Sequence, residues 1–327
     1  MIQRCVTIGR LGTFIIETDS CDGSGTFYRF VKVDGKLRKR STEKPNMHQA
    51  KPKTVKKWDG HTHSEMCRHG DGDRTATMVE KAIEAGFTHY SITEHAPLPD
   101  DFFPTETLLG EFGLLRRELP DYFDLIRDLK RLYGNRIRIY CGLEFDYLRG
   151  QESFTRDLIA SCENELDEFL LSIHFMEGKK GFCCIDFTPE DFGVGLVRHH
   201  GGADRVHDIY WSLVEAMVSE KWHASLPVRI GHLGLIDKYV GKYPLKDRDR
   251  YGTSYFENLF RRIKGQGYGL DVNAAGLDIK TCGEIYFTVP MRHWSEKLNI
   301  ELVYGSDAHG ARRVGRYYDT VQSIFGL

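Results

Sequence analysis

The sequence predicts an α/β protein built around a barrel of seven β/α units, preceded by a small extension. Strand-like and helix-like runs alternate from about residue 58 to the C-terminus, and this alternation is typical of a parallel sheet. Six of the seven predicted strands end on His, Glu or Asp, and the carboxyl ends of barrel strands meet at one face. An open, doubly wound sheet is the alternative, but it explains less well why so many strands end on such residues.

The extension covers residues 1–57 and is basic. It holds 13 Lys and Arg against 5 Asp and Glu, a net charge of +8, whereas the rest of the chain holds 32 against 42, a net charge of −10. Two strand-like runs, at 5–17 and 26–33, enclose a segment of turn composition at 19–25. We therefore expect a β-hairpin-like element, followed by a basic linker over 36–57. A basic arm can also meet nucleic acid, but no aromatic-rich pattern accompanies this one.

The composition indicates a soluble globular protein. Hydrophobic residues make up 41% and charged residues 28% of the 327 residues, and no run approaches the roughly 18 apolar residues of a membrane helix. The first residues lack the apolar core of a signal peptide. None of the eight cysteines forms a C-x-x-C pair, so we expect reduced thiols and a cytoplasmic location.

The predicted strands are short runs that each lead to a polar residue. They cover 57–63, 89–93, 137–143, 169–173, 228–231, 268–272 and 302–305. Apolar residues spaced three and four apart predict the intervening helices. The helices cover 76–85, 121–133, 204–221, 254–264 and the C-terminal segment. Gly86 and Gly134 follow the first two, and a glycine favours a helix end.

The first strand carries the strongest local motif, His61-Thr62-His63. Two histidines one residue apart lie on the same face of an extended strand, because side chains alternate. His69 follows in a turn rich in Gly and Asp that can fold back. Neutral imidazole is the commonest metal ligand in proteins, so this motif predicts the start of a metal site.

Nine residues in all are candidate metal ligands. They are His61, His63, His69, His95, Glu144, His174, His232, Asp307 and His309. Each alone has an ordinary alternative: His95 can cap a turn before Ala96-Pro97, and a histidine that closes an apolar strand is often a core residue. Nine such residues near the same end of consecutive strands are hard to explain separately. Together they predict a metal centre.

The chain resembles the polymerase and histidinol phosphatase (PHP) superfamily, and within it the PHP-type histidinol-phosphatases. The matching segments are Asp59-Gly60-His61-Thr62-His63-Ser64, Ile92-Thr93-Glu94-His95, Gly142-Leu143-Glu144-Phe145-Asp146-Tyr147, Ser172-Ile173-His174-Phe175, Gly231-His232-Leu233, Asn273-Ala274-Ala275-Gly276 and Gly305-Ser306-Asp307-Ala308-His309. The resemblance covers about residues 58–327 and all nine metal positions of the family. It does not cover residues 1–57.

The resemblance implies a distorted, TIM-like (β/α)₇ barrel and a trinuclear metal cluster. One metal would take His61, His63, Glu144 and Asp307; a second would share Glu144 and add His174 and His232; the third would take His69, His95 and His309. Mixed nitrogen and oxygen ligands suit zinc, iron or manganese. Cys67 lies between two ligands, but the nine others suffice without it.

The implied activity is hydrolysis of L-histidinol phosphate to L-histidinol and phosphate, a step of histidine biosynthesis. A hydroxide bridging two metals would attack phosphorus in line, since paired metals can clamp the attacking and phosphoryl oxygens. Asp307, His232 and Glu144 are the residues expected to carry catalysis. Arg198 and Lys238 are candidates for contacts with the phosphate. The expected partner is a small phosphate monoester, with no membrane and no nucleic acid.

Two other classes stay open. Another PHP phosphoesterase, such as a nucleotide phosphatase, a phosphodiesterase or a nuclease, would share the cluster. An open basic groove would favour nucleic acid, whereas a pocket sized for a monoester would favour histidinol phosphate. A non-catalytic binding module would have lost metal ligands, and this chain has kept all nine.

Overall fold

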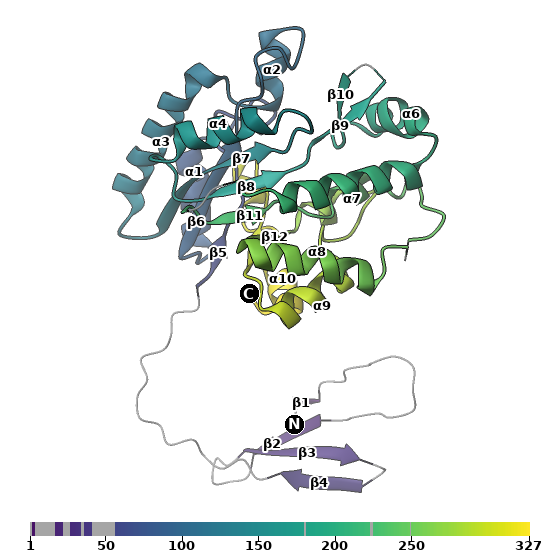
Figure 1. The fold of residues 1–327 in the computed structure, drawn as a ribbon. Helices are drawn as coiled ribbons and strands as arrows, with labels where there is room; N and C mark the ends of the chain where they lie inside the picture. The colour runs from purple at the N-terminus through teal and green to yellow at the C-terminus, as the bar shows by residue number, and fades with distance from the viewer. Residues whose placement is uncertain are drawn as a thin grey trace. The chain divides into compact units, whose positions relative to one another are not determined.

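The computed structural model describes residues 2–3, 17–21, 27–33, 36–40, 56–179, 181–222, 225–248 and 250–327. The chain divides into two compact units, Met1–Val55 and Lys56–Leu327, both drawn in Figure 1. The division falls two residues before the boundary that the charge distribution predicts. That boundary, and the role of the extension as a domain of its own, stay predictions.

The first unit contains a four-stranded sheet. Its strands, in spatial order, are β1 (Ile2–Gln3), β2 (Glu17–Cys21), β3 (Phe27–Val33) and β4 (Lys36–Arg40), and each pairs antiparallel with the next. The predicted strand at 26–33 is confirmed as β3. The turn predicted from residue 19 and the linker predicted from residue 36 are wrong at their starts, because β2 and β4 pair with β3 there. Residues 5–16 of the other predicted strand lie outside the described residues.

Seven parallel strands form the sheet of the second unit, in the order β13-β12-β11-β8-β7-β6-β5. They are β5 (Trp58–Asp59), β6 (His89–His95), β7 (Arg138–Asp146), β8 (Phe169–Ser172), β11 (Val228–Ile230), β12 (Gly269–Asn273) and β13 (Leu302–Gly305). Figure 1 shows helices packed around this sheet. Every residue of β8 and β12 is buried, as expected for strands covered on both faces.

Hydrogen bonds between the first and last strands close the sheet into a barrel. The Gly60 amide donates to the Tyr304 carbonyl at 2.8 Å, and the Asp307 amide donates to the His61 carbonyl at 2.7 Å. Beyond β5, Thr62 forms a further parallel bridge with Ala308. The predicted barrel is therefore confirmed, and the open sheet is excluded. The first strand is shorter than predicted.

The helices alternate with the strands. They are α1 (Thr75–Glu84), α2 (Glu106–Phe112), α3 (Leu119–Tyr133), α4 (Glu152–Cys162), α5 (Pro189–Asp191), α6 (Arg198–His200), α7 (Ala203–Ser219), α8 (Thr253–Gln266), α9 (Val289–Leu298) and α10 (Tyr318–Phe325), with short helical turns η1 (Arg116–Glu118), η2 (Phe192–Val197), η3 (Leu235–Tyr239), η4 (Ala275–Asp278) and η5 (Ala311–Arg313). The five predicted helices are confirmed as α1, α3, α7, α8 and α10. None of the helices in the described part of the chain has the length and apolarity needed to cross a bilayer.

Sequence reasoning missed α2, α4, α9 and a hairpin of two strands, β9 (Phe175–Gly178) and β10 (Gly181–Cys184). The cause is clearest for α2, which buries only Leu109 and Gly110 and so has little apolar periodicity. The hairpin lies outside the barrel sheet and follows directly on His174.

A small second core joins the α2 region to this hairpin. Its buried members are Leu98, Leu109, Leu115, Leu148 and Phe175, with Phe102, Phe103, Phe112, Phe182 and Cys184 packed against them. The rings of Phe102 and Phe182 stack with centroids 5.0 Å apart. This core fixes two segments beside the carboxyl ends of the barrel strands, and both contribute to the site described below.

A buried ion pair holds the backbone at the end of the first strand. The Arg229 guanidinium donates two hydrogen bonds to the Glu168 carboxylate, at 2.6 and 3.0 Å, and one to the Gly60 carbonyl at 2.6 Å. Both side chains are less than 5% exposed. Because Gly60 precedes His61, this pair also positions the metal motif.

Glu168→Gln is expected to lower the free energy of unfolding by about 3–5 kcal/mol, since it leaves the Arg229 charge buried without its partner. For a unit of this size, the melting temperature should fall by roughly 10 °C. Thermal unfolding followed by circular dichroism measures the change. The control is a double variant, Glu168→Met with Arg229→Met, which removes both charges and should recover most of the loss. A single variant that melts at the wild-type temperature contradicts this role.

Candidate metal centre

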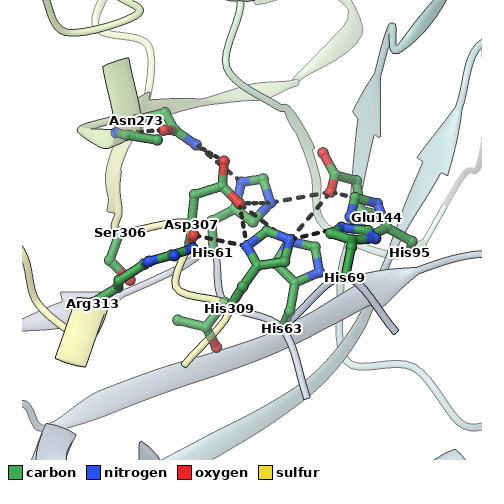
Figure 2. A network of polar contacts seen from close by, with 12 residues as sticks. His61, His63, His69, His95, Glu144, Asn273, Ser306, Asp307, His309 and Arg313 are labelled. Carbon is green, nitrogen blue, oxygen red and sulfur yellow. Dashed lines mark hydrogen bonds and ion pairs between the residues drawn. The ribbon is translucent and has the colours of Figure 1, made fainter. Parts of the chain in front are cut away.

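The structure brings all nine predicted ligands together at the carboxyl end of the barrel strands, and Figure 2 shows seven of them. His95 ends β6 and Glu144 lies within β7, whereas the other seven lie in the segments that follow β5, β8, β11 and β13. His61, His63, Glu144 and His232 are almost fully buried. A parallel barrel gathers these residues because every strand points its carboxyl end to the same face.

Glu144 is the hub of the cluster. Its carboxylate oxygens lie within 3.7 Å of imidazole nitrogens from five histidines: His232 at 2.9 Å, His61 at 3.2 Å, His95 at 3.3 Å, His174 at 3.6 Å and His63 at 3.7 Å. Burial alone would raise the pKa of this carboxyl group, but the histidines around it hold the pKa well below its usual range. Glu144 is therefore an anion at the centre of the site.

Asp307 supplies the second carboxylate. Its Oδ1 lies 3.2 Å from His63 Nε2, and its backbone is left-handed, with φ of 54°. Hydrogen bonds hold this unusual turn: Asp59 accepts from the amides of Ser306 and Gly315 at 2.9 and 3.2 Å. Asn273 Nδ2 donates to the other Asp307 oxygen at 3.2 Å. The turn thus aims Asp307 into the cluster.

An outer ring of oxygen atoms fixes the imidazoles. The Nδ1 atoms of four histidines face an acceptor: His61 faces Asp271 at 2.8 Å, His63 faces Glu94 at 3.2 Å, His174 faces Asp146 at 3.0 Å and His69 faces the Glu111 carbonyl at 2.7 Å. An imidazole that donates from Nδ1 keeps a lone pair on Nε2, and this arrangement is typical of metal-ligating histidines. All four Nε2 lone pairs are therefore available to an ion.

The inner nitrogens are placed to share a cation. His174 Nε2 and His232 Nε2 face each other at 3.1 Å, and so do His69 Nε2 and His309 Nε2. In the described part of the chain, four sets of donor atoms lie within 4.8 Å of one another: His61, His63 and Asp307; His61, Glu144 and His232; His95, Glu144 and His174; and His63, Cys67, His95 and His309. The donor set fits divalent metals such as zinc.

Two histidines of the cluster, His63 and His309, have pKa values that are shifted in opposite directions. Burial lowers the basicity of His63, but hydrogen bonds to Asp307 and Glu94 outweigh it and raise its pKa to about 9. Burial together with His63 lowers the pKa of His309 to about 3. Neighbouring rings thus avoid carrying like charges.

A profile of the PHP domain family matches residues 59–275. The chain belongs to the PHP family. Among curated PHP relatives, histidinol-phosphatase of Bacillus subtilis (strain 168) is 30% identical over 265 residues, which cover 81% of this chain and 98% of that protein. This similarity includes nearly the whole length of the relative.

Two solved PHP structures share the fold. A protein of Listeria monocytogenes assigned as a histidinol phosphatase is 36% identical, with a TM-score of 0.76 over 81% of this chain and 99% of that one. Histidinol phosphate phosphatase of Lactococcus lactis, solved with zinc, L-histidinol and phosphate, is 19% identical, with a TM-score of 0.58 over 82% of this chain and 93% of that one. The second similarity shows only that the two proteins share a fold.

A cavity of about 360 Å³ opens beside the PHP cluster. It is lined by six of the predicted ligands, by Phe112, Phe175 and Phe187, and by the charged residues Glu111, Asp186, Lys238, Arg313 and Arg316. Of the two predicted phosphate contacts, Lys238 lines this cavity. Arg198 is exposed on α6 and is not part of the lining, so the structure does not bring it to the site.

Two arginines that sequence reasoning missed line the cavity, Arg313 and Arg316. Arg316 braces the Asp307 turn, because it donates to the carbonyls of Ser306 and Asp307 at 2.6 and 3.1 Å. Arg313 pairs with Asp71 at 3.1 Å and is 45% exposed, so it can turn toward an anion in the cavity. Both follow the last metal motif by only a few residues.

The outer-ring acids Glu94, Asp146 and Asp271 were also missed. A signal for the two aspartates exists in the sequence. Asp146 lies two residues after Glu144, and Asp271 lies two residues before Asn273, so each shares a strand face with a residue of the site. A carboxylate inside an otherwise apolar strand is costly unless paired, and this cost points to a partner in the site.

Proposed function

We propose that the protein is a metal-dependent phosphatase that hydrolyses L-histidinol phosphate to L-histidinol and phosphate. The observation that carries the proposal is the complete nine-residue cluster, which faces a cavity of about 360 Å³ with cations in its wall. Such a volume is at the small end of ligand pockets and suits a small monoester better than a polymer. The similarity to histidinol-phosphatase of B. subtilis over 81% of the chain supports this substrate.

Three divalent metals, zinc, iron or manganese, would be held by the nine residues. The first would take His61, His63, Glu144 and Asp307; the second Glu144, His174 and His232; the third His69, His95 and His309. The number of metals and these sets belong to the proposal. When bound, the metals supply a nucleophilic water at neutral pH and neutralise phosphoryl charge.

The protein's own residues orient the reacting groups and neutralise their charge. Glu144 and His232 hold the centre of the cluster at 2.9 Å from each other. Burial would raise the pKa of Asp307, but His61 and His63 hold it well below its usual range, so this carboxylate is an anion that can orient the attacking water by accepting a hydrogen bond from it. Lys238 and Arg313 are the cations placed to neutralise the remaining phosphoryl oxygens.

Phosphate release by the metal-loaded protein tests the proposal. L-Histidinol phosphate, a nucleoside monophosphate and a phosphodiester are compared at equal concentration, and a Glu144→Gln preparation purified in parallel reports any contaminating phosphatase. We expect kcat/KM for histidinol phosphate to exceed the others by roughly 100-fold or more, the discrimination that several buried polar contacts provide. Preferred hydrolysis of the nucleotide or the diester would refute the substrate and keep the phosphoesterase.

A further inference from the structure

We propose that Asp186 binds the ammonium group of the substrate and makes the site selective for phosphate monoesters of 2-amino alcohols. This inference rests on the proposed function and names the group that recognises the non-phosphoryl end of the substrate. L-Histidinol phosphate belongs to this class, since its ammonium group is separated from the ester oxygen by two carbon atoms.

Asp186 is rigidly placed in the cavity wall. It follows β10, and the amide of the preceding residue, Ile185, donates to the His174 carbonyl at 2.8 Å. The Asp186 carbonyl accepts a hydrogen bond from the Tyr239 hydroxyl at 2.7 Å. The backbone is thus tied both to a metal-ligand candidate and to η3, so the carboxylate keeps a fixed distance from the cluster.

The Asp186 carboxylate has acceptor capacity left for a ligand. Lys238 Nζ donates to Oδ2 at 3.0 Å, and the Cys184 thiol donates to Oδ1 at 3.1 Å. A carboxylate can accept about four hydrogen bonds, and the side chain is 23% exposed in a wall of the cavity. Burial alone would raise its pKa, but the Lys238 ammonium holds the pKa below its usual range, so the group is an anion.

The pairing with Lys238 matches a substrate that carries both charges. Lys238 lines the cavity together with Asp307 of the cluster, and its Nζ lies 3.0 Å from Asp186 Oδ2. A 2-amino alkyl phosphate places a cation and an anion within a few bonds of each other. The adjacent anion and cation of the cavity wall therefore present charges complementary to the two charges of this substrate class.

Two other carboxylates line the cavity, and neither suits the ammonium as well. Asp307 is committed to the cluster through His63. The Glu111 side chain on α2 is exposed, and solvent screens an exposed charge, so an ion pair there contributes little. Glu111 is consequently the matched control for Asp186.

The experiment compares L-histidinol phosphate with 3-(imidazol-4-yl)propyl phosphate, which lacks only the amine. We expect wild-type protein to favour the amine-bearing substrate by roughly 10- to 100-fold in kcat/KM, the range of a hydrogen bond to a charged group. Asp186→Asn should reduce this ratio to near one. Lys238→Met should lower kcat/KM for both substrates alike and keep the ratio, and Glu111→Gln should also keep it.

A purely structural role of Asp186, such as holding Lys238, would lower both substrates equally and leave the ratio unchanged, and that result overturns the proposal. Loss of the ratio in Glu111→Gln overturns it as well. Calorimetric binding of L-histidinol against 3-(imidazol-4-yl)propanol decides the matter without turnover. If the wild type hydrolyses neither phosphate but binds the amino alcohol in an Asp186-dependent manner, the proposed function fails and the amine site stands; equal binding of both alcohols refutes the amine site.

Discussion

Glu144→Gln is expected to lower kcat/KM for phosphate monoester hydrolysis by roughly 1,000-fold. The substitution keeps the size of the side chain and removes the central negative charge, which lies within 3.7 Å of nitrogens from five histidines. Loss of an outer partner of a metal ligand typically costs about 10- to 100-fold in metal affinity or activity, and loss of the central carboxylate, which contacts five of the ligands directly, should cost more. The metal content should fall with the activity.

Steady-state kinetics and elemental analysis of the purified variant measure both effects. Glu94→Gln is the graded control, because Glu94 touches the cluster only through His63 and Ser64. Loss of such an outer partner typically costs about 10- to 100-fold. If Glu144→Gln retains activity within roughly tenfold of wild type, Glu144 is not the hub of the catalytic centre.

Removal of the metals is expected to abolish activity and to lower the melting temperature by roughly 10 °C. An ion that binds only the folded state at 1,000 times its Kd adds about 4 kcal/mol of stability, and a barrel of this size shifts by about 2–4 °C per kcal/mol. The ions would also bind between two pairs of imidazole nitrogens that face each other at 3.1 Å.

Differential scanning fluorimetry before and after dialysis against a chelator measures the shift, and phosphate release measures the activity. Restoring zinc, manganese or iron(II) singly then identifies which ion recovers both. Dialysis without chelator is the control for handling. Unchanged activity after verified loss of metal would exclude metal-dependent hydrolysis.

The barrel and the ligands were predictable from sequence because both follow local rules. Each barrel strand is a short run that leads to a polar residue, and the two motifs at His61 and Asp307 give strong spacing signals. The particular hydrogen bonds that join the first and last strands, and the Asp186–Lys238 pair, were not predictable, since they join segments 52 or more residues apart. Arg198 was chosen for its charge alone, and charge does not report which way a helix end faces.

The N-terminal sheet also shows that charge alone does not predict where a segment lies in the fold. Residues 36–40 are almost entirely basic and look like a linker, yet they pair with β3. Backbone hydrogen bonding is indifferent to side-chain charge, so a basic run can form an edge strand. The two residues between β3 and β4, Asp34-Gly35, were the available signal, because this pair favours a two-residue hairpin.

The hydrogen bonds that close the barrel join His61 and His63 to Asp307 and Ala308. The segments that follow the first and last strands therefore meet in the metal centre. Metal binding therefore cross-links two segments that are separated by nearly the whole sequence of the barrel. During synthesis, the nascent chain cannot assemble the centre until its last strand has left the ribosome. A fragment that stops before Asp307 should bind metal weakly and hydrolyse nothing, which makes metal uptake a direct report that the entire barrel has folded.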